Sequence, residues 1–200
     1  MPHARKDNID WLPDNYYHLY NRGARRLTIF PEEDNYLFVL RKVKKYCAEC
    51  DLTLIAYCLM PNHYHFLTRQ NGEHPAGLLP QRVFNSYSKA YNKKYEHSGT
   101  LFERRFQAKH IIDDTYLRHL CRYIHANPVK DGLVGRLEDW PYSNYPEWMD
   151  LRPGALFDSA FVADFFESKA SYKAFVLDFL STRYLPDGLD YLNDDPPANK

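Results

Sequence analysis

The sequence has few of the features that mark secreted or membrane proteins. Only four cysteines occur in 200 residues, and they fall within apparently regular segments, so no disulfide framework is expected. No apolar run approaches the roughly 18 residues that cross a bilayer, and residues 1–10 are polar and lack the apolar stretch of a secretory signal. These absences predict reduced thiols and no membrane segment, with the cytoplasm as the expected location.

Two common chemical motifs are also missing or incomplete. Cys47 and Cys50 form a C-x-x-C pair, but no second pair stands at zinc-site spacing, so a coincidence on a helix explains them better than a zinc knuckle does. The phosphate-binding pattern G-x-x-x-x-G-K-S/T does not occur. The sequence therefore contains no phosphate-binding loop of this type.

Neither sign of charge is in excess, because 26 basic residues balance 26 acidic ones. Net charge thus gives no argument for a polyanionic partner, and evidence for one must come from local clusters. A solvated helix face accounts for any single cluster better than a binding site does. Basic residues gather at 25–26, 41–45, 93–94, 104–109 and 118–122, and acidic residues gather between 138 and 195.

Hydrophobic periodicity predicts alternating strands and helices in a single core-forming domain, for which a 44% hydrophobic content is sufficient. Strands are expected within 14–23, 52–59 and 63–69, the last two as a hairpin; helices at 31–50, 81–96 and 115–127; and an extended or irregular stretch at 99–109. This order predicts an α+β sandwich in which helices cover an antiparallel sheet. Two short helical patterns follow, at 159–167 and 171–180, and residues 193–200 are expected to be disordered.

His63 and His65 are the most informative pair for chemistry. Residues two apart in a strand point to the same side of the sheet, so both imidazoles converge on one point, while Tyr64 and Phe66 face the other way. This is how backbone geometry alone places two metal ligands. An isolated H-x-H is more often structural than functional, so a third partner is needed.

The predicted helix over 115–127 offers that partner. Tyr123 and Asn127 lie one turn apart on a flank of its apolar stripe, where a side chain can face the sheet surface. The Asn127 amide oxygen suits Mg²⁺ or Mn²⁺, although zinc also fits imidazole ligands, and the Tyr123 hydroxyl could attack an electrophile on the metal. Tyr116, two turns earlier on the same flank, competes for this role, and 17 tyrosines make a packing role for either one a strong alternative.

Five stretches resemble the REP-associated tyrosine transposases, a group within the transposases that carry a His-hydrophobe-His motif and one catalytic tyrosine. The stretches are YNRG at 20–23, MPNHYHFL at 60–67, GTLFERRF at 99–106, YIHANPVK at 123–130 and WPYS at 140–143. The resemblance implies a ferredoxin-like sheet, metal ligation by His63 and His65, and Tyr123 rather than Tyr116 as the nucleophile. Related insertion-sequence enzymes carry a glutamine where Asn127 stands, and an aliphatic residue where Tyr64 stands.

The implied reaction is cleavage of single-stranded DNA beside a hairpin with Mg²⁺ or Mn²⁺, leaving a 5′-phosphotyrosine and a free 3′-hydroxyl that later rejoin. The resemblance covers about residues 16–145, so we expect residues 1–150 to form the transposase domain. Residues 151–200, which it does not cover, are expected to form a helical extension, for which we favour a packing role. Monomer and homodimer both remain open. Aromatic and basic residues expected to contact the hairpin or single strand are Phe102, Arg104, Arg105, Lys109, Arg118 and Arg122.

Three other functions remain open at this point. A metal-dependent hydrolase would use the His63 and His65 pair to activate water and would not need Tyr123. A catalytically idle protein would bind DNA or RNA hairpins without cleaving them. A replication initiator or relaxase shares the motifs but generally places its tyrosine differently and belongs to longer chains.

Overall fold

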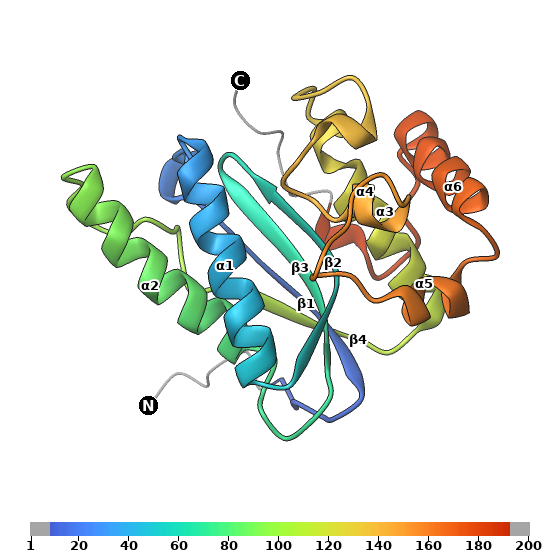
Figure 1. Cartoon of the computed structure of the whole chain (residues 1–200), viewed down its shortest axis with the longest axis horizontal. Coiled ribbons are helices and arrows are strands. Elements are labelled where there is room, and N and C mark those ends of the chain that lie inside the picture. Colours follow the sequence, from blue (N-terminus) through green and yellow to red (C-terminus); the bar gives the residue numbers. More distant parts are fainter. Residues whose placement is uncertain (1–8, 193–200) are drawn as a thin grey trace.

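The computed structural model describes residues 9–192, and an antiparallel sheet of four strands lies at its centre (Figure 1). The strands are β1 Asn15–Arg22, β2 Leu52–Met60, β3 His63–Gln70 and β4 Gln107–Ile111, in the order β2-β3-β1-β4. β2 and β3 form the predicted hairpin, and β3 and β1 are the two inner strands. The expected α+β fold is confirmed. Residues 1–8, where no secretory signal is expected, and residues 193–200, where disorder is expected, lie outside the described residues.

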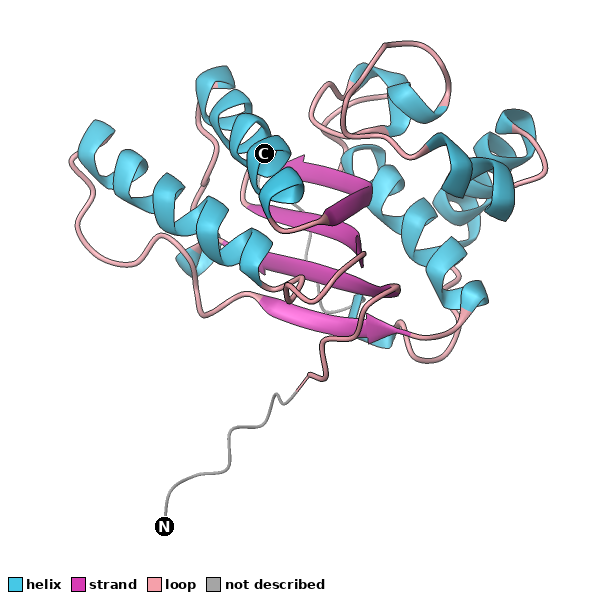
Figure 2. Cartoon of the chain, turned by 60° about the horizontal axis from the view of Figure 1, so that its bottom comes forward, coloured by secondary structure: helices cyan, strands magenta, loops and turns pink. Residues whose placement is uncertain are grey.

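Helices cover both faces of the sheet (Figure 2). On one face lie α1 Glu33–Glu49 and α2 Leu78–Lys94, which share a core with Tyr64 and Phe66 of β3. On the other lies α3 Asp114–Lys130, whose apolar side packs on β2 and on Leu67. Because side chains alternate along a strand, this split leaves His63 and His65 on the α3 face.

α3 continues past the expected end. The prediction that it stops at Asn127 is wrong, since the helix includes Pro128 and ends at Lys130. Proline lacks the backbone N–H that would donate to the Ile124 carbonyl, so the last turn has one intrahelical bond fewer, and the Asp131 N–H, which donates to the Asn127 carbonyl at 2.9 Å, completes it. The Asp113 side chain accepts from the Tyr116 backbone N–H at 3.0 Å and caps the other end.

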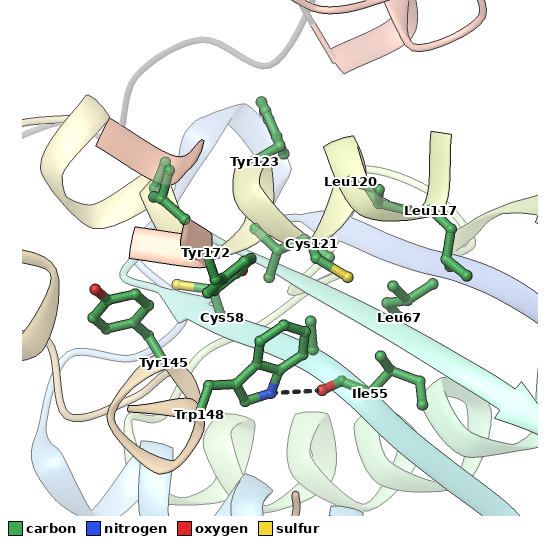
Figure 3. Packing of buried hydrophobic residues seen from close by; sticks show 14 of the residues in the cluster. Ile55, Cys58, Leu67, Leu117, Leu120, Cys121, Tyr123, Tyr145, Trp148 and Tyr172 are labelled. Carbon is green, nitrogen blue, oxygen red and sulfur yellow. Dashed lines mark hydrogen bonds between the residues drawn. The ribbon is translucent and has the colours of Figure 1, made fainter. Parts of the chain in front are cut away.

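The residues after 150 pack against α3 rather than standing apart. α5 Ser159–Phe165 and α6 Lys169–Thr182 contribute to the same core as α3, together with the short helix α4 Tyr145–Trp148. In that core the Trp148 indole N–H donates to the Ile55 carbonyl at 3.3 Å (Figure 3). Three 3₁₀ turns complete the described chain: η1 Ala24–Arg26, η2 Leu137–Asp139 and η3 Asp190–Leu192.

Two expectations from composition can be checked in the described part of the chain. All four cysteines are free and buried, and burial raises the pKa of the Cys47 thiol to about 12. Within residues 9–192, no helix combines the length and apolar character that a bilayer crossing requires.

Candidate active site

A row of polar side chains crosses the α3 face of three neighbouring strands. His65 pairs with Tyr20 of β1, which pairs with Gln107 of β4, and His18 pairs with Lys109. Residues directly opposite each other on antiparallel strands project to the same face, so these side chains meet on one surface. The strand register therefore builds a continuous polar strip beside α3.

The two histidines of the H-x-H motif are buried and lie side by side. His63 is 3% exposed and His65 is fully buried, and their ring centroids are 5.1 Å apart. Each ring uses its Nδ1 atom for a hydrogen bond: His63 with Asn62 Oδ1 at 2.7 Å, and His65 with His18 Nε2 at 2.9 Å. Engaging Nδ1 in this way leaves Nε2 as the atom through which each imidazole would ligate a metal.

Tyr123 reaches the same place from α3. Its ring meets the His65 ring edge-on with centroids 5.6 Å apart. Lys130 lies two helical turns after Tyr123. Its ammonium donates to the Tyr123 hydroxyl at 3.3 Å and lies 4.8 Å from the centre of the Tyr123 ring. A cation at this distance stabilises negative charge that develops on the phenolic oxygen during an attack.

Tyr123 is covered by the end of the described chain. The ring is 1% exposed, and its hydroxyl donates to the Leu192 carbonyl at 3.3 Å. The neighbouring Tyr191 stacks on Tyr20 with centroids 5.7 Å apart, and the Lys109 ammonium lies 5.4 Å from the Tyr191 ring. A substrate could reach the Tyr123 hydroxyl only after η3 moves away.

Asn127 fits the expected third ligand in chemistry and burial. Its side chain is fully buried, and among the described residues neither Oδ1 nor Nδ2 has a hydrogen-bond partner. Such a group is costly to bury, which is consistent with a ligand role for its oxygen. Within residues 9–192, no three His, Cys, Asp or Glu side chains form a metal-binding group.

A cavity of about 280 Å³ opens beside His65. Its walls include Tyr20, Tyr191, Arg104 and Lys109, and both of these basic side chains are exposed. A second hollow of about 230 Å³, on the α2 side of Arg104, is lined by Arg105 and by the half-buried Phe102, among others. Four of the six residues expected to contact DNA thus line two hollows that share the Arg104 side chain.

Arg122 does not join this surface. It is 1% exposed, and its guanidinium donates to Asp178 Oδ2 at 3.1 Å and to the Tyr184 carbonyl at 2.8 Å. Loss of hydration lowers its pKa, and the Asp178 carboxylate partly offsets that shift. The expectation that Arg122 meets a phosphate is wrong, because the packing of α6 encloses the guanidinium.

Arg118 is exposed but lies in another part of the molecule. It stands over the Phe166 ring at 5.4 Å and lines a pocket between α3 and α6. Tyr116, the competitor of Tyr123, contacts the Gly188 region instead of the two histidines. Only one of the two tyrosines therefore meets the H-x-H motif.

The sequence of this chain was compared with known protein families. The family model described as "Transposase IS200 like" matches residues 12–127, more than half of the chain. The chain belongs to this family. The match includes both histidines, Tyr123 and Asn127, whereas Lys130 and Tyr191 lie beyond it.

Two curated relatives of this IS200-like transposase are REP-associated tyrosine transposases, which confirms the resemblance noted in the sequence. One, from Haemophilus influenzae, is 33% identical over 113 residues, which are 51% of this chain and 64% of the relative, just under two thirds of its length. Another, from Escherichia coli K12, is 26% identical over 131 residues, covering 64% of this chain and 72% of the relative.

A solved REP-associated tyrosine transposase, whose structure contains a REP hairpin, has the same fold. It superposes with a TM-score of 0.62 at 19% identity, over 76% of this chain and 93% of that one. At this identity the likeness establishes the fold of the IS200-like transposase and no more.

Several motif residues of the transposase have structural roles that the sequence did not reveal. The Gly23 N–H donates to the Asn62 carbonyl at 2.8 Å, and a Cβ at Gly23 would lie 2.2 Å from the Leu27 carbonyl oxygen. His125 is buried between the Tyr172 hydroxyl at 2.6 Å and Asn144 Oδ1 at 2.9 Å. These residues hold the loops and α3 in place around the site.

His18, Lys130 and Tyr191 belong to the site but were not expected there. Lys130 carried a detectable signal, because it follows Tyr123 by seven residues, two helical turns, and so lies on the same side of α3. His18 and Tyr191 join through pairing and packing between segments 173 residues apart, as their hydrogen bond of 2.9 Å shows. No local pattern encodes such a contact.

Proposed function

We propose that this IS200-like transposase cleaves and rejoins single-stranded DNA beside a hairpin, with Tyr123 as the nucleophile. The observation that carries the proposal is the meeting of Tyr123, His65 and Lys130, because it combines a nucleophile, a metal-ligand type and a cation at one point. A chain that only bound hairpins would not need a cation on a buried tyrosine hydroxyl.

The residues present fit a divalent ion, Mg²⁺ or Mn²⁺, held by the Nε2 atoms of His63 and His65 and the Asn127 carboxamide oxygen. Such an ion supplies Lewis-acid polarisation of a phosphate oxygen. Asn62 and His18 orient the two imidazoles toward that position through the Nδ1 hydrogen bonds.

In the proposed reaction the Tyr123 oxygen forms a bond to the phosphorus atom and the bond from phosphorus to the 3′ oxygen breaks. The phenolic proton passes to solvent and the departing 3′ oxygen takes one up, so the step is balanced without a further reactant. Lys130 stabilises the negative charge that develops on the attacking oxygen. The 5′-phosphotyrosine conserves the phosphodiester energy, so rejoining by a 3′-hydroxyl needs no nucleotide.

The strand would run through the two hollows that meet at Arg104. Lys109 and Arg105 offer charge to phosphates there, and Phe102 and Tyr20 offer ring faces for bases. The hairpin bound by the solved relative supports a DNA hairpin as the partner of this chain too.

The test uses end-labelled single-stranded oligonucleotides that span a palindromic hairpin from beside the protein's own gene, with Mg²⁺ or Mn²⁺. We expect a protein–DNA adduct that survives denaturing electrophoresis, disappears in Tyr123→Phe and persists in Tyr116→Phe. Cleavage without an adduct, equal in Tyr123→Phe, would instead establish a hydrolase that activates water. Tight binding without cleavage under any divalent ion would leave a hairpin-binding protein.

A further inference from the structure

His18 is a β1 residue that lies outside the H-x-H motif and contacts His65. Its ring is fully buried and lies parallel to the His65 ring, with centroids 5.1 Å apart and an interplanar angle of 17°. Both of its nitrogens are engaged: Nε2 with His65 Nδ1 at 2.9 Å, and Nδ1 with the Tyr191 hydroxyl at 2.9 Å. The three side chains form one hydrogen-bonded row.

The row has only two proton arrangements when both imidazoles are neutral, since each ring then has one donor and one acceptor nitrogen. In the first, His65 donates from Nδ1 to His18 Nε2, and His18 donates from its own Nδ1 to Tyr191. The His65 Nε2 atom then carries a lone pair. In the second, His18 donates from Nε2 to His65, the proton of His65 sits on Nε2, and His65 cannot ligate a metal.

Both arrangements satisfy these hydrogen bonds, and the first is the one that leaves His65 able to ligate a metal through Nε2. The Tyr191 hydroxyl has acceptor lone pairs, so it can receive the His18 Nδ1 proton. His63 shows the same pattern with a different partner, since the carboxamide oxygen Asn62 Oδ1 can only accept and so requires a proton on His63 Nδ1. With both Nδ1 atoms acting as donors, both Nε2 atoms are ligands of the same type.

We propose that His18 is a positioning residue for the metal ligand His65. Its Nε2 accepts the His65 Nδ1 proton, selects the tautomer that ligates through Nε2, and fixes the ring beside Tyr123. The proposal rests on the proposed function for the identity of the ligand that His65 takes, a divalent ion. A residue that only filled space at position 18 would not need two engaged nitrogens in a fully buried ring.

The first measurement is made on the metal-free protein and needs no DNA. Histidine ¹⁵N chemical shifts report which ring nitrogen carries the proton. We expect His65 to be protonated on Nδ1 in the wild type and to lose that preference in His18→Phe, which keeps an aromatic ring but has no acceptor. A wild-type His65 with its proton on Nε2 would overturn the proposal, whatever the variants do.

The second measurement is Mn²⁺ affinity, followed by the loss of the free-ion electron paramagnetic resonance signal on titration. Removing a partner that orients a ligand typically weakens metal binding 10- to 100-fold, and we expect about this loss in His18→Phe. His18→Gln, whose carboxamide can place an acceptor near the Nε2 position, should recover most of the affinity. His110→Phe is the matched control, because His110 is a strand histidine on the opposite face of the sheet, stacked on Tyr17.

The outcomes separate this proposal from the proposed function. Unchanged Mn²⁺ affinity in a folded His18→Phe would refute the positioning role and leave the transesterase intact. Unchanged Mn²⁺ affinity in the His63→Ala, His65→Ala double variant would refute the metal site itself. The His65 tautomer, compared between the wild type and His18→Phe, would then still show whether His18 selects the protonated nitrogen of His65. Should His18→Phe fail to fold, the wild-type spectrum decides, because a His65 proton on Nε2 would refute the positioning role.

Discussion

The contacts of Tyr191 predict how strongly the end of the described chain restrains the site. Several interactions of Tyr191 hold η3 over Tyr123, among them the hydrogen bond to His18, the stack on Tyr20 and the position of Lys109 over its ring. Truncation to alanine removes these three, whereas Tyr191→Phe removes only the hydrogen bond. The pair of variants therefore separates the polar contact from the ring contacts.

The expected magnitude follows from typical values for each contact. A hydrogen bond contributes about 1 kcal/mol, an aromatic stack about 0.5 to 1.5 kcal/mol and an exposed cation–π contact about 0.5 to 1 kcal/mol. Tyr191→Ala should thus favour opening by about 2 to 3.5 kcal/mol, roughly a 30- to 370-fold shift in the equilibrium. Tyr191→Phe should shift it about fivefold.

Hydrogen–deuterium exchange measures this opening without any assay of activity. The Leu192 N–H donates to the Leu189 carbonyl at 2.9 Å and the Leu189 N–H to the Pro186 carbonyl at 3.2 Å, so both amides should exchange faster by the predicted factor. Single-turnover adduct formation at saturating Mn²⁺ should accelerate in the same order. Tyr184→Ala is the control, because Tyr184 is 59% exposed and its ring lies away from the site.

Equal exchange at Leu189 and Leu192 in wild type and Tyr191→Ala would refute the reasoning. It would mean that other contacts hold η3, such as the Leu192 carbonyl that accepts from Tyr123. Faster exchange with unchanged adduct formation would show that the segment opens freely before the chemical step.

Three further predictions concern stability and DNA binding. Burial lowers the pKa of His125 to about 4, below the value of about 6.5 in the unfolded chain. The neutral ring therefore contributes stability above about pH 6.5, and this contribution is lost as the pH falls toward 4. Between pH 7 and pH 5 the free energy of unfolding in urea should fall by about 2 kcal/mol. His125→Leu should lower stability at pH 7 but remove this part of the pH dependence, and an unchanged slope would contradict the assignment. Arg122→Met should lower the melting temperature without changing the affinity for the hairpin, because Arg122 is buried. Arg104→Ala should weaken hairpin binding and reduce the slope of log K against log salt concentration by about 0.7 to 0.9. Loss of hairpin affinity in a folded Arg122→Met protein would contradict the buried role of Arg122. Gly23→Ala should destabilise the protein by about 2 kcal/mol or more in the same urea assay, because the added Cβ would overlap the backbone carbonyl of Leu27. Unchanged stability would show that residues 24–27 can shift to make room for the Cβ at little cost.

Local periodicity was sufficient to predict most of the fold. The strands at 14–23, 52–59 and 63–69 and the helices at 31–50 and 115–127 all correspond to elements of the structure, with ends shifted by a few residues. The stretch expected to be extended or irregular contains β4 only from Gln107 onward, because one edge strand of five residues leaves little alternation to read. Most strands and helices of this fold are thus determined by the local pattern of apolar and polar residues in the sequence.

The convergence of the site was predictable in part for the same reason. His63 and His65 share a face because they are two apart in a strand, and Tyr123 and Asn127 lie on one side of α3 because they are one turn apart. Both relations hold within a single element. That Tyr123 rather than Tyr116 meets the histidines depends on where α3 crosses the sheet, which the family resemblance suggested and spacing alone did not.

What the sequence alone determined are therefore the elements and the faces that their side chains share, since backbone geometry repeats every two or 3.6 residues. Only the tertiary structure decided which faces meet. It brought His18 to His65 across 47 residues and the Leu192 carbonyl to Tyr123 across 69, and it enclosed Arg122 under a helix 56 residues away. These contacts depend on strand register and on packing between distant segments, and neither leaves a periodic signal in the chain.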